Sequence, residues 1–187
     1  AIFDGVYKVR GERVPILSLS NKWQNRRLTP NTLPLDFAAW SIDGGKTWNA
    51  PEPVLGIYTR FAEKEAYDGK LLLRYSFHVK DMPELCAVAI EQPWIYEDIK
   101  VNGQSVSFSK DSTYIDHTIC QTSVASLLHE GKNEIILSLD NKSARPADAN
   151  AIIRYGTELE TIYLVGDFGV QGTLAKEDEA IGYIIRT

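Results

Sequence analysis

Paired carboxylates are the chemistry that this sequence could supply most readily, because it contains 25 acidic residues. Hydrolysis of a glycosidic bond needs two carboxylates that face each other across a cleft, about 5 to 9.5 Å apart. No motif singles out such a pair, and Glu91 and Glu160 are the candidates only if a pair has to be chosen. Both are equally typical of strand-edge carboxylates that hydrogen-bond to the backbone. We therefore predict no catalytic residue.

The remaining reactive residue types lack the spacing that catalysis or metal binding requires. The three histidines occur in unrelated contexts, and no G-x-S-x-G, C-x-x-C or H-x-x-x-H is present. Hard oxygen ligands gather only around Asp140, Asn141, Asp148 and Asn150, without the dense alternation of a calcium loop. We predict no cofactor, with a structural calcium ion at Asp140, Asp148 and Asn150 as the weaker alternative.

Aromatic rings beside polar side chains could bind a sugar, since the apolar side of a pyranose stacks on a ring face while polar groups take the hydroxyls. Trp23 lies in a polar loop, Trp94 follows Pro93, and Tyr114 follows the polar segment K-D-S-T. A polar row also follows one side of the expected strand Leu71–Val79. The candidate carbohydrate contacts are Trp23, Trp94, Tyr96, Tyr114, Arg74 and His78. Each is also compatible with a place in the core, in an interface or on a solvated face.

The elements that would position these residues are short strands. Asn102-Gly103 predicts a tight hairpin turn, because both central positions of such a turn need positive φ. Before it, Ile95, Ile99 and Val101 alternate with Tyr96, Asp98 and Lys100, which places Tyr96 on the polar face. After it, Thr122 or Ser123 could cap a short helical turn that Gly131 ends.

The whole pattern predicts an all-β fold, an antiparallel β-sandwich in a single domain over 1–187. Residues 1–35 read as an irregular lead-in, and Asn141–Asn150 reads as a loop that leads into a short helix. The expected strands are Phe37–Ile42, Pro53–Tyr58, Leu71–Val79, Leu85–Glu91, Ile95–Val101, Tyr114–Ile119, Glu134–Leu139, Glu158–Asp167 and Ile181–Arg186.

One short motif, S-I-D-G-G-K-T-W at 41–48, is similar to the Asp-box of sialidase propellers. A propeller repeats this motif on several blades, and the chain has a single copy. We therefore interpret Asp43, Gly44 and Gly45 as a structural hairpin tip anchored by Trp48, with a sugar-lining role as the alternative.

Composition excludes several partners. The net charge of −5 offers no basic stripe for nucleic acid. The longest apolar runs, such as Ala87–Ile90, are far shorter than the roughly 20 residues of a membrane span.

Cys86 and Cys120 are expected to be two buried thiols, with a disulfide as the alternative. The start at Ala1 suggests a piece excised from a longer secreted protein.

Three segments carry a resemblance to a known family: V-N-G at 101–103, D-H-T at 116–118 and L-H-E-G-K-N-E-I at 128–135. Together they resemble the sugar-binding β-sandwich of glycoside hydrolase family 2 and its relatives, the galactose-binding-like jelly rolls. The flanks N-T-L-P-L-D at 31–36 and L-E-T-I-Y-L-V-G-D-F-G-V at 159–170 resemble the same module in large α-L-rhamnosidase-like bacterial enzymes. The resemblance covers roughly residues 30 to 170 and brings no catalytic residue, since the family's acid and nucleophile lie elsewhere.

These observations predict a non-catalytic accessory domain of a multidomain glycoside hydrolase. It would pack on the catalytic domain of the same polypeptide, contribute to contact with carbohydrate, and be extracellular or periplasmic. An autonomous carbohydrate-binding module is the alternative, and a self-sufficient glycosidase or lyase is a third class.

Overall fold

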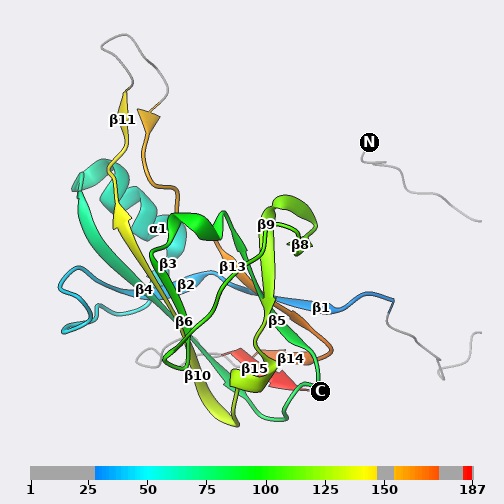
Figure 1. Cartoon of the computed structure of the whole chain (residues 1–187). Helices are drawn as coiled ribbons and strands as arrows, with labels where there is room; N and C mark the ends of the chain where they lie inside the picture. Colours follow the sequence, from blue (N-terminus) through cyan, green and yellow to red (C-terminus); the bar gives the residue numbers. More distant parts are fainter. Residues whose placement is uncertain (1–27, 147–153, 173–182, 187) are drawn as a thin grey trace, which may run out of the picture.

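The chain folds into two facing β-sheets with a short helix at one side (Figure 1). The structure is a computed structural model that describes residues 28–146, 154–172 and 183–186. The first sheet has five strands, and every neighbouring pair is antiparallel. In spatial order these strands are β1 (Asn31–Leu35), β13 (Ile162–Gly166), β5 (Cys86–Glu91), β9 (Asp116–Ser123) and β8 (Thr113–Tyr114).

The second sheet is built around the two longest strands, β4 (Gly69–Val79) and β10 (Gly131–Asn141), which pair along their full length. β6 (Asp98–Val101) pairs with the free side of β10, and β7 (Gln104–Ser105) follows it. The other side of β4 pairs with β2 (Phe37–Ser41) and, farther along, with β15 (Tyr183–Arg186). The remaining strands are β3 (Glu52–Pro53), which pairs with β2, and β14 (Gly169–Gly172), which pairs with β15.

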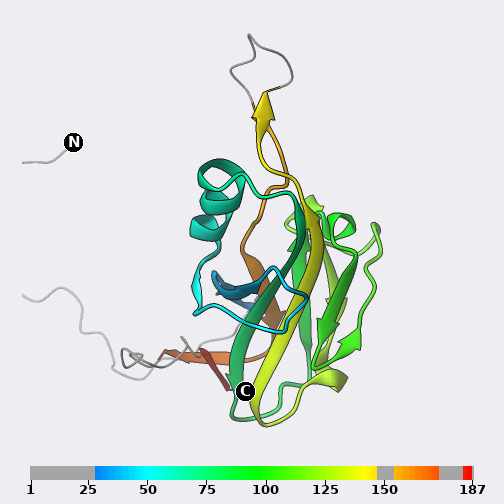
Figure 2. The same ribbon diagram turned by 90° about the vertical axis from the view of Figure 1, so that its left-hand side faces the viewer.

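The sandwich is therefore confirmed, and its pairing is antiparallel except at β15, which runs parallel to β4. A separate pair, β11 (Arg145–Pro146) with β12 (Arg154–Tyr155), projects from one end of the molecule (Figure 2). It occupies part of the segment where a loop and a short helix were expected, while residues 147–153 lie outside the described part of the chain.

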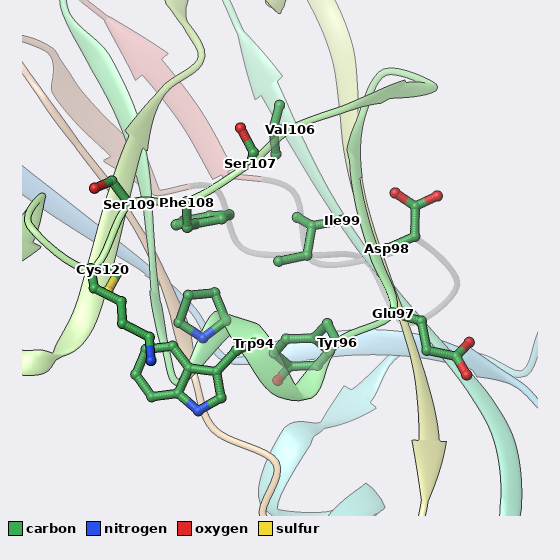
Figure 3. Close-up of a pocket in the computed structure, with 12 residues that line it drawn as sticks. Trp94, Tyr96, Glu97, Asp98, Ile99, Val106, Ser107, Phe108, Ser109 and Cys120 are labelled. Atoms are coloured by element: carbon green, nitrogen blue, oxygen red, sulfur yellow. The ribbon is translucent and has the colours of Figure 1, made fainter.

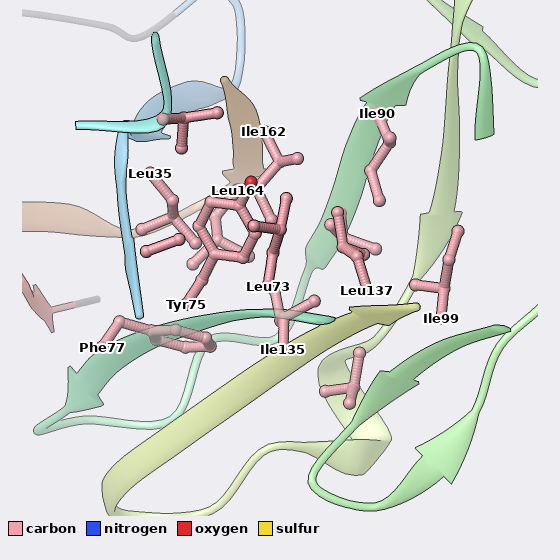
Figure 4. Packing of buried hydrophobic residues seen from close by; sticks show 14 of the residues in the cluster. Leu35, Leu73, Tyr75, Phe77, Ile90, Ile99, Ile135, Leu137, Ile162 and Leu164 are labelled. Carbon is pink, nitrogen blue, oxygen red and sulfur yellow. The ribbon is translucent and has the colours of Figure 1, made fainter. Parts of the chain in front are cut away.

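The core lies between the two sheets (Figure 4). Strict alternation along β4 buries Leu71, Leu73, Tyr75, Phe77 and Val79 to 2% exposure or less. β10 does the same with Ile135, Leu137 and Leu139. In Figure 4 the labelled side chains of β4 and β10, such as Leu73 and Leu137, face Ile90, Ile162 and Leu164 from the first sheet. The period of two in the sequence is thus the direct cause of the sandwich.

The Asn102-Gly103 turn forms as predicted. Asn102 has φ 48° and Gly103 has φ 81°, and Val101 pairs with Gln104 across the turn. These are the two positive φ values that a tight primed hairpin needs.

Two expected elements are wrong. Pro53–Tyr58 is not a strand, because α1 (Val54–Thr59) runs into the π-helical turn η1 (Arg60–Lys64). Val54, Ile57 and Phe61 are buried, which is a helical spacing rather than an alternation. Asn31–Leu35, placed in the irregular lead-in, is strand β1 instead, and residues 1–27 of that lead-in lie outside the described residues.

The helical turn before β10 is shorter than expected and uses other caps. It is the 3-10 turn η3 (Ala125–Leu127), and its N-cap is Val124, without a side-chain cap bond from Thr122 or Ser123. Gly131 does take a positive φ of 91°, but it opens β10 rather than ending the turn.

The 41–48 motif closes a hairpin tip, as interpreted. The Asp43 carboxylate accepts hydrogen bonds from the backbone N–H groups of Lys46 and Thr47, each at 3.0 Å. It also accepts the Thr47 hydroxyl at 2.6 Å. Gly44 and Gly45 have φ of 76° and 85°, and a Cβ at Gly45 would lie 3.4 Å from the Trp48 ring. These contacts explain the motif as a structural turn.

Candidate functional site

The clearest concave aromatic surface lies beside Trp94, and we name it the Trp94 pocket (Figure 3). Its volume is about 240 Å³. Its aromatic and apolar walls come from Trp94, Tyr96, Ile99, Val106 and Phe108, and its polar rim comes from Glu97, Asp98, Ser107, Ser109 and Lys110. The pocket therefore combines ring faces with hydroxyl and charged groups, which is the composition that a sugar site needs.

The local backbone explains why one aromatic residue of this segment points out and the next points in. Gln92 has a left-handed φ of 46°, and Pro93 opens the 3-10 turn η2 (Pro93–Ile95). The turn breaks the alternation expected before β6. As a result Trp94 is 50% exposed, whereas Tyr96 is only 8% exposed. The expectation that Tyr96 lies on the polar face is wrong, because the alternation starts only at Asp98.

Lys110 partly occupies the outer face of the pocket. Its ammonium nitrogen lies 5.0 Å from the centre of the Trp94 ring, within the range of a cation–π contact. A ligand that stacks on Trp94 must therefore displace Lys110 or use it as a neighbour. Because Lys110 is exposed, displacing it costs little.

A second concavity, the Glu160 pocket, lies on the other side of Tyr96 and has a volume of about 330 Å³. Its carboxylates belong to Glu91, Glu158, Glu160 and Asp140. Partial burial raises the pKa of Glu160, and the nearby carboxylates of Glu91 and Glu158 raise it further. The structure thus brings Glu91 and Glu160 into one pocket, although they are far apart in the sequence.

Tyr96 lines both pockets. Burial is the main cause that raises its pKa, and the carboxylates of Glu160 and Glu91 raise it further. In Figure 3 its hydroxyl points away from Val106 and Ser107. Tyr96 is therefore a side chain that the two pockets share.

The other candidate contacts lie apart from these pockets. The Arg74 guanidinium lies 4.2 Å from the centre of the Trp48 ring, which covers it. His78 is exposed on β4 and pairs in register with Lys132. Tyr114 is half-buried, and its hydroxyl hydrogen-bonds to that of Thr32. Trp23 lies outside the described residues.

The segment expected to bind calcium is described only in part. Asp140 forms an ion pair with Lys142 at 2.7 Å, and Asp148 and Asn150 lie outside the described residues. Among the residues that the structure describes, no group of three or more His, Cys, Asp or Glu is arranged to hold a metal ion.

Sequence reasoning missed Phe108, Lys110 and Glu158 as pocket residues. A signal for Phe108 exists, because V-S-F-S at 106–109 alternates apolar and small polar residues. No comparable signal marks Lys110 or Glu158. Lys110 reaches the Trp94 pocket because the loop after β7 folds back toward it, and Glu158 reaches the Glu160 pocket because the segment before β13 does the same.

No family model and no curated protein match this sequence. Solved structures do share its fold. A β-glucuronidase from Ruminococcus gnavus in complex with D-glucaro-d-lactam matches with a TM-score of 0.50 and 11% identity, over 82% of this chain and 33% of that chain. The β-glucuronidase from the same organism in complex with uronic isofagomine also matches with a TM-score of 0.50 and 11% identity. That match covers 85% of this chain and 33% of the β-glucuronidase chain. A β-D-mannosidase from Dictyoglomus thermophilum matches with a TM-score of 0.49 and 15% identity, over 79% of this chain and 25% of the mannosidase chain.

The chain thus spans about a third or less of the length of these solved structures. Identities this low show the fold alone. The class defined here is an all-β sandwich of a kind that also occurs as one part of longer glycosidase chains. In the described part of the chain, no helix has the length and apolar character to cross a membrane.

Proposed function

We propose that this chain is a non-catalytic β-sandwich domain of a multidomain glycoside hydrolase, which packs on the catalytic domain of the same polypeptide and contributes to glycan contact. One observation carries the proposal. This chain aligns over 82% of its length with 33% of a β-glucuronidase chain, at a TM-score of 0.50. The three sequence segments that resemble family 2 sandwiches support the same assignment.

Glycan contact is assigned to the Trp94 pocket. Trp94 presents a half-exposed indole, and the serine, lysine and carboxylate groups of the rim supply partners for hydroxyls. The segments 31–36 and 159–170 support a more specific proposal, in which the parent enzyme is a bacterial α-L-rhamnosidase-like protein. We propose that it is extracellular or periplasmic, and that this domain has no cofactor and no nucleic-acid partner.

An autonomous carbohydrate-binding module is the second candidate, and the exposure of Trp94 favours it. A scaffold needs no exposed indole above a pocket, whereas a binding module does. The two candidates differ in whether the chain binds glycan without its neighbours.

A glycan array probed with the 187-residue chain, followed by tryptophan fluorescence titration, distinguishes them. Specific binding that Trp94→Ala abolishes and Trp48→Phe preserves would favour the module, because Trp48 lies on the 41–48 hairpin beside Arg74 and not in the pocket. Silence across the array would favour the scaffold that we propose first. Circular dichroism of both variants checks that the fold is intact.

The non-catalytic part of the proposal has its own test. We expect no hydrolysis of any member of a panel of aryl glycosides by this chain. Turnover that Glu91→Gln or Glu160→Gln abolishes would overturn the accessory role and place a carboxylate pair in the Glu160 pocket.

A further inference from the structure

Both carboxylates on the rim of the Trp94 pocket already have a cationic partner. Glu97 forms an ion pair with Lys70 at 2.7 Å, and Asp98 forms one with Lys100 at 3.1 Å. In Figure 3 the two carboxylates also point away from Trp94. Because each lysine offsets the charge of its carboxylate, these pairs repel an anion beside Trp94 only weakly. The acidic residues of the lining therefore do not make this pocket a cation site.

Lys110, in contrast, has no ionic partner among the residues that the structure describes. Its ammonium nitrogen lies 5.0 Å from the centre of the Trp94 ring, which is a cation–π contact. Such a contact is weak at an exposed position, and it does not use the three N–H donors as an anion would. Lys110 can therefore bind an anion at the pocket without breaking an ion pair.

The rest of the lining determines which kind of anion fits. Trp94 is 50% exposed, so part of its indole is available to stack on the apolar side of a sugar ring. Ser107 and Ser109 flank Phe108 in the sequence and bring hydroxyl groups to the same pocket. The volume of about 240 Å³ lies just below the range for drug-sized ligands, which suits one sugar ring. A small inorganic anion would use Lys110 and leave the aromatic wall uncovered.

We propose that the Trp94 pocket binds a sugar that carries a negative charge, with its ring stacked on Trp94 and its carboxylate or sulfate group on Lys110. The inference rests on the proposed role of this pocket in glycan contact and names the class of glycan. Charge-assisted hydrogen bonds from the ammonium group provide the selectivity, because they are stronger than hydrogen bonds between neutral groups. A uronic acid and a sulfated sugar share this chemistry and differ in the shape of the anion.

Binding of charged and neutral sugars with the same ring to the 187-residue chain tests the proposal. The pairs are glucuronic acid with its methyl ester, galacturonic acid with its methyl ester, and glucose 6-sulfate with glucose. The amide NMR shifts of residues 94–96 and 107–110 report on the pocket during each titration. We expect the charged member of at least one pair to bind about fivefold more tightly at low salt, and less so at high salt. The pair with the larger preference identifies carboxylate or sulfate as the anion.

Three variants assign the preference to its residues. Lys110→Gln should remove the preference and keep the binding of the neutral sugar, whereas Lys110→Arg should keep the preference because the charge remains. Trp94→Ala should weaken the binding of both members of a pair. Lys132→Gln is the matched control, since it removes another exposed lysine charge, on β10 and outside the pocket, and should change nothing. Circular dichroism checks the fold of each variant.

Three results would overturn the proposal while sugars still bind. They are equal binding of the two members in all three pairs, a charge preference that survives Lys110→Gln, and tighter binding of glucosamine than of every anionic sugar. In the last case the ligand would replace Lys110 on the ring instead of pairing with it. All three leave the proposed glycan contact in place. Binding of no sugar, charged or neutral, would remove the glycan contact as well, so the two failures are distinguishable.

Discussion

The side-chain amide of Asn102 donates a hydrogen bond to Oδ1 of Asn133 at 2.8 Å, joining the β6–β7 hairpin to the start of β10. In both side chains the amide nitrogen donates hydrogen bonds and the amide oxygen accepts them. Asn102 also donates to the Leu127 carbonyl and accepts from the Glu134 N–H. Asn133, which is 1% exposed, also bonds to the backbone of His129 and Gly131. The half-buried Asn102 of the V-N-G segment and the buried Asn133 of the G-K-N segment therefore form one hydrogen-bond network that fixes both turns.

Replacing Asn133 with alanine should destabilise the fold, because several buried backbone groups and the Asn102 amide lose their partners. We expect a loss of about 3 kcal/mol in the free energy of unfolding, measured by urea denaturation. Asn49→Ala, at an exposed position, is the control and should change stability little. In a double-mutant cycle, Asn102→Ala and Asn133→Ala should be clearly less than additive. Additive losses would mean that the bond between them contributes nothing.

The sequence predicts best where a local rule decides the structure. The Asn102-Gly103 turn needs two positive φ values, and the alternation along Leu71–Val79 can bury only one set of side chains. It predicts worst where a short apolar segment fits two periods. Val54–Thr59 contains enough apolar residues to read as a strand, and only its packing around Ile57 makes it a helix.

The candidate site is less predictable because its parts come together through the sheet order. Glu91 and Glu160 share a pocket because β5 and β13 are neighbours, with Val88 opposite Leu164. Nothing in either local sequence specifies that pairing. Trp94 could be singled out as a candidate contact from the sequence, but its exposure depends on the left-handed Gln92 and the turn that follows.

The 41–48 hairpin should depend on pH through Asp43. Hydrogen bonds from the Thr47 hydroxyl and N–H are the main causes that hold the pKa of this carboxyl well below its ordinary value of 3.8. A lowered folded-state pKa means that the stabilisation is fully present above 3.8 and is lost as the pH falls through the folded value.

We therefore expect Asp43→Asn to lower the melting temperature at neutral pH and to have a progressively smaller effect below pH 4. Thermal unfolding of both proteins from pH 7 to pH 2 measures this. Asp111→Asn, an exposed change on another loop, provides the comparison. A difference between Asp43→Asn and the parent that stays constant down to pH 2 would contradict the role of the carboxylate.

Tyr75 carries a buried hydroxyl that the fold does not use. The residue is 0% exposed, and its hydroxyl has no hydrogen-bond partner among the described residues. Tyr75→Phe should therefore raise the free energy of unfolding by about 1 kcal/mol, because a desolvated polar group is removed and the ring is kept. The matched control is Tyr67→Phe, which removes a hydroxyl that donates to the Lys70 carbonyl at 2.9 Å and should destabilise. Equal effects of the two changes would show that the Tyr75 hydroxyl finds a partner in solution.

Cys86 and Cys120 lie in neighbouring strands but cannot form a disulfide without rearrangement. Cys120 pairs in register with Ile90, four residues along β5 from Cys86, which is a separation of about 14 Å. A disulfide needs Cα atoms within about 7 Å. Both thiols are free and buried, and burial raises the pKa of Cys86 to about 12.

A thiolate is the reactive form of cysteine, so the folded chain should not react with a thiol reagent at pH 8. We expect two equivalents of label in urea and none in native buffer, with the same mass before and after reduction. Labelling of the native chain within minutes would show that the first sheet opens at β5 and β9. A mass increase of two hydrogens on reduction would show a disulfide and require a different register between these strands.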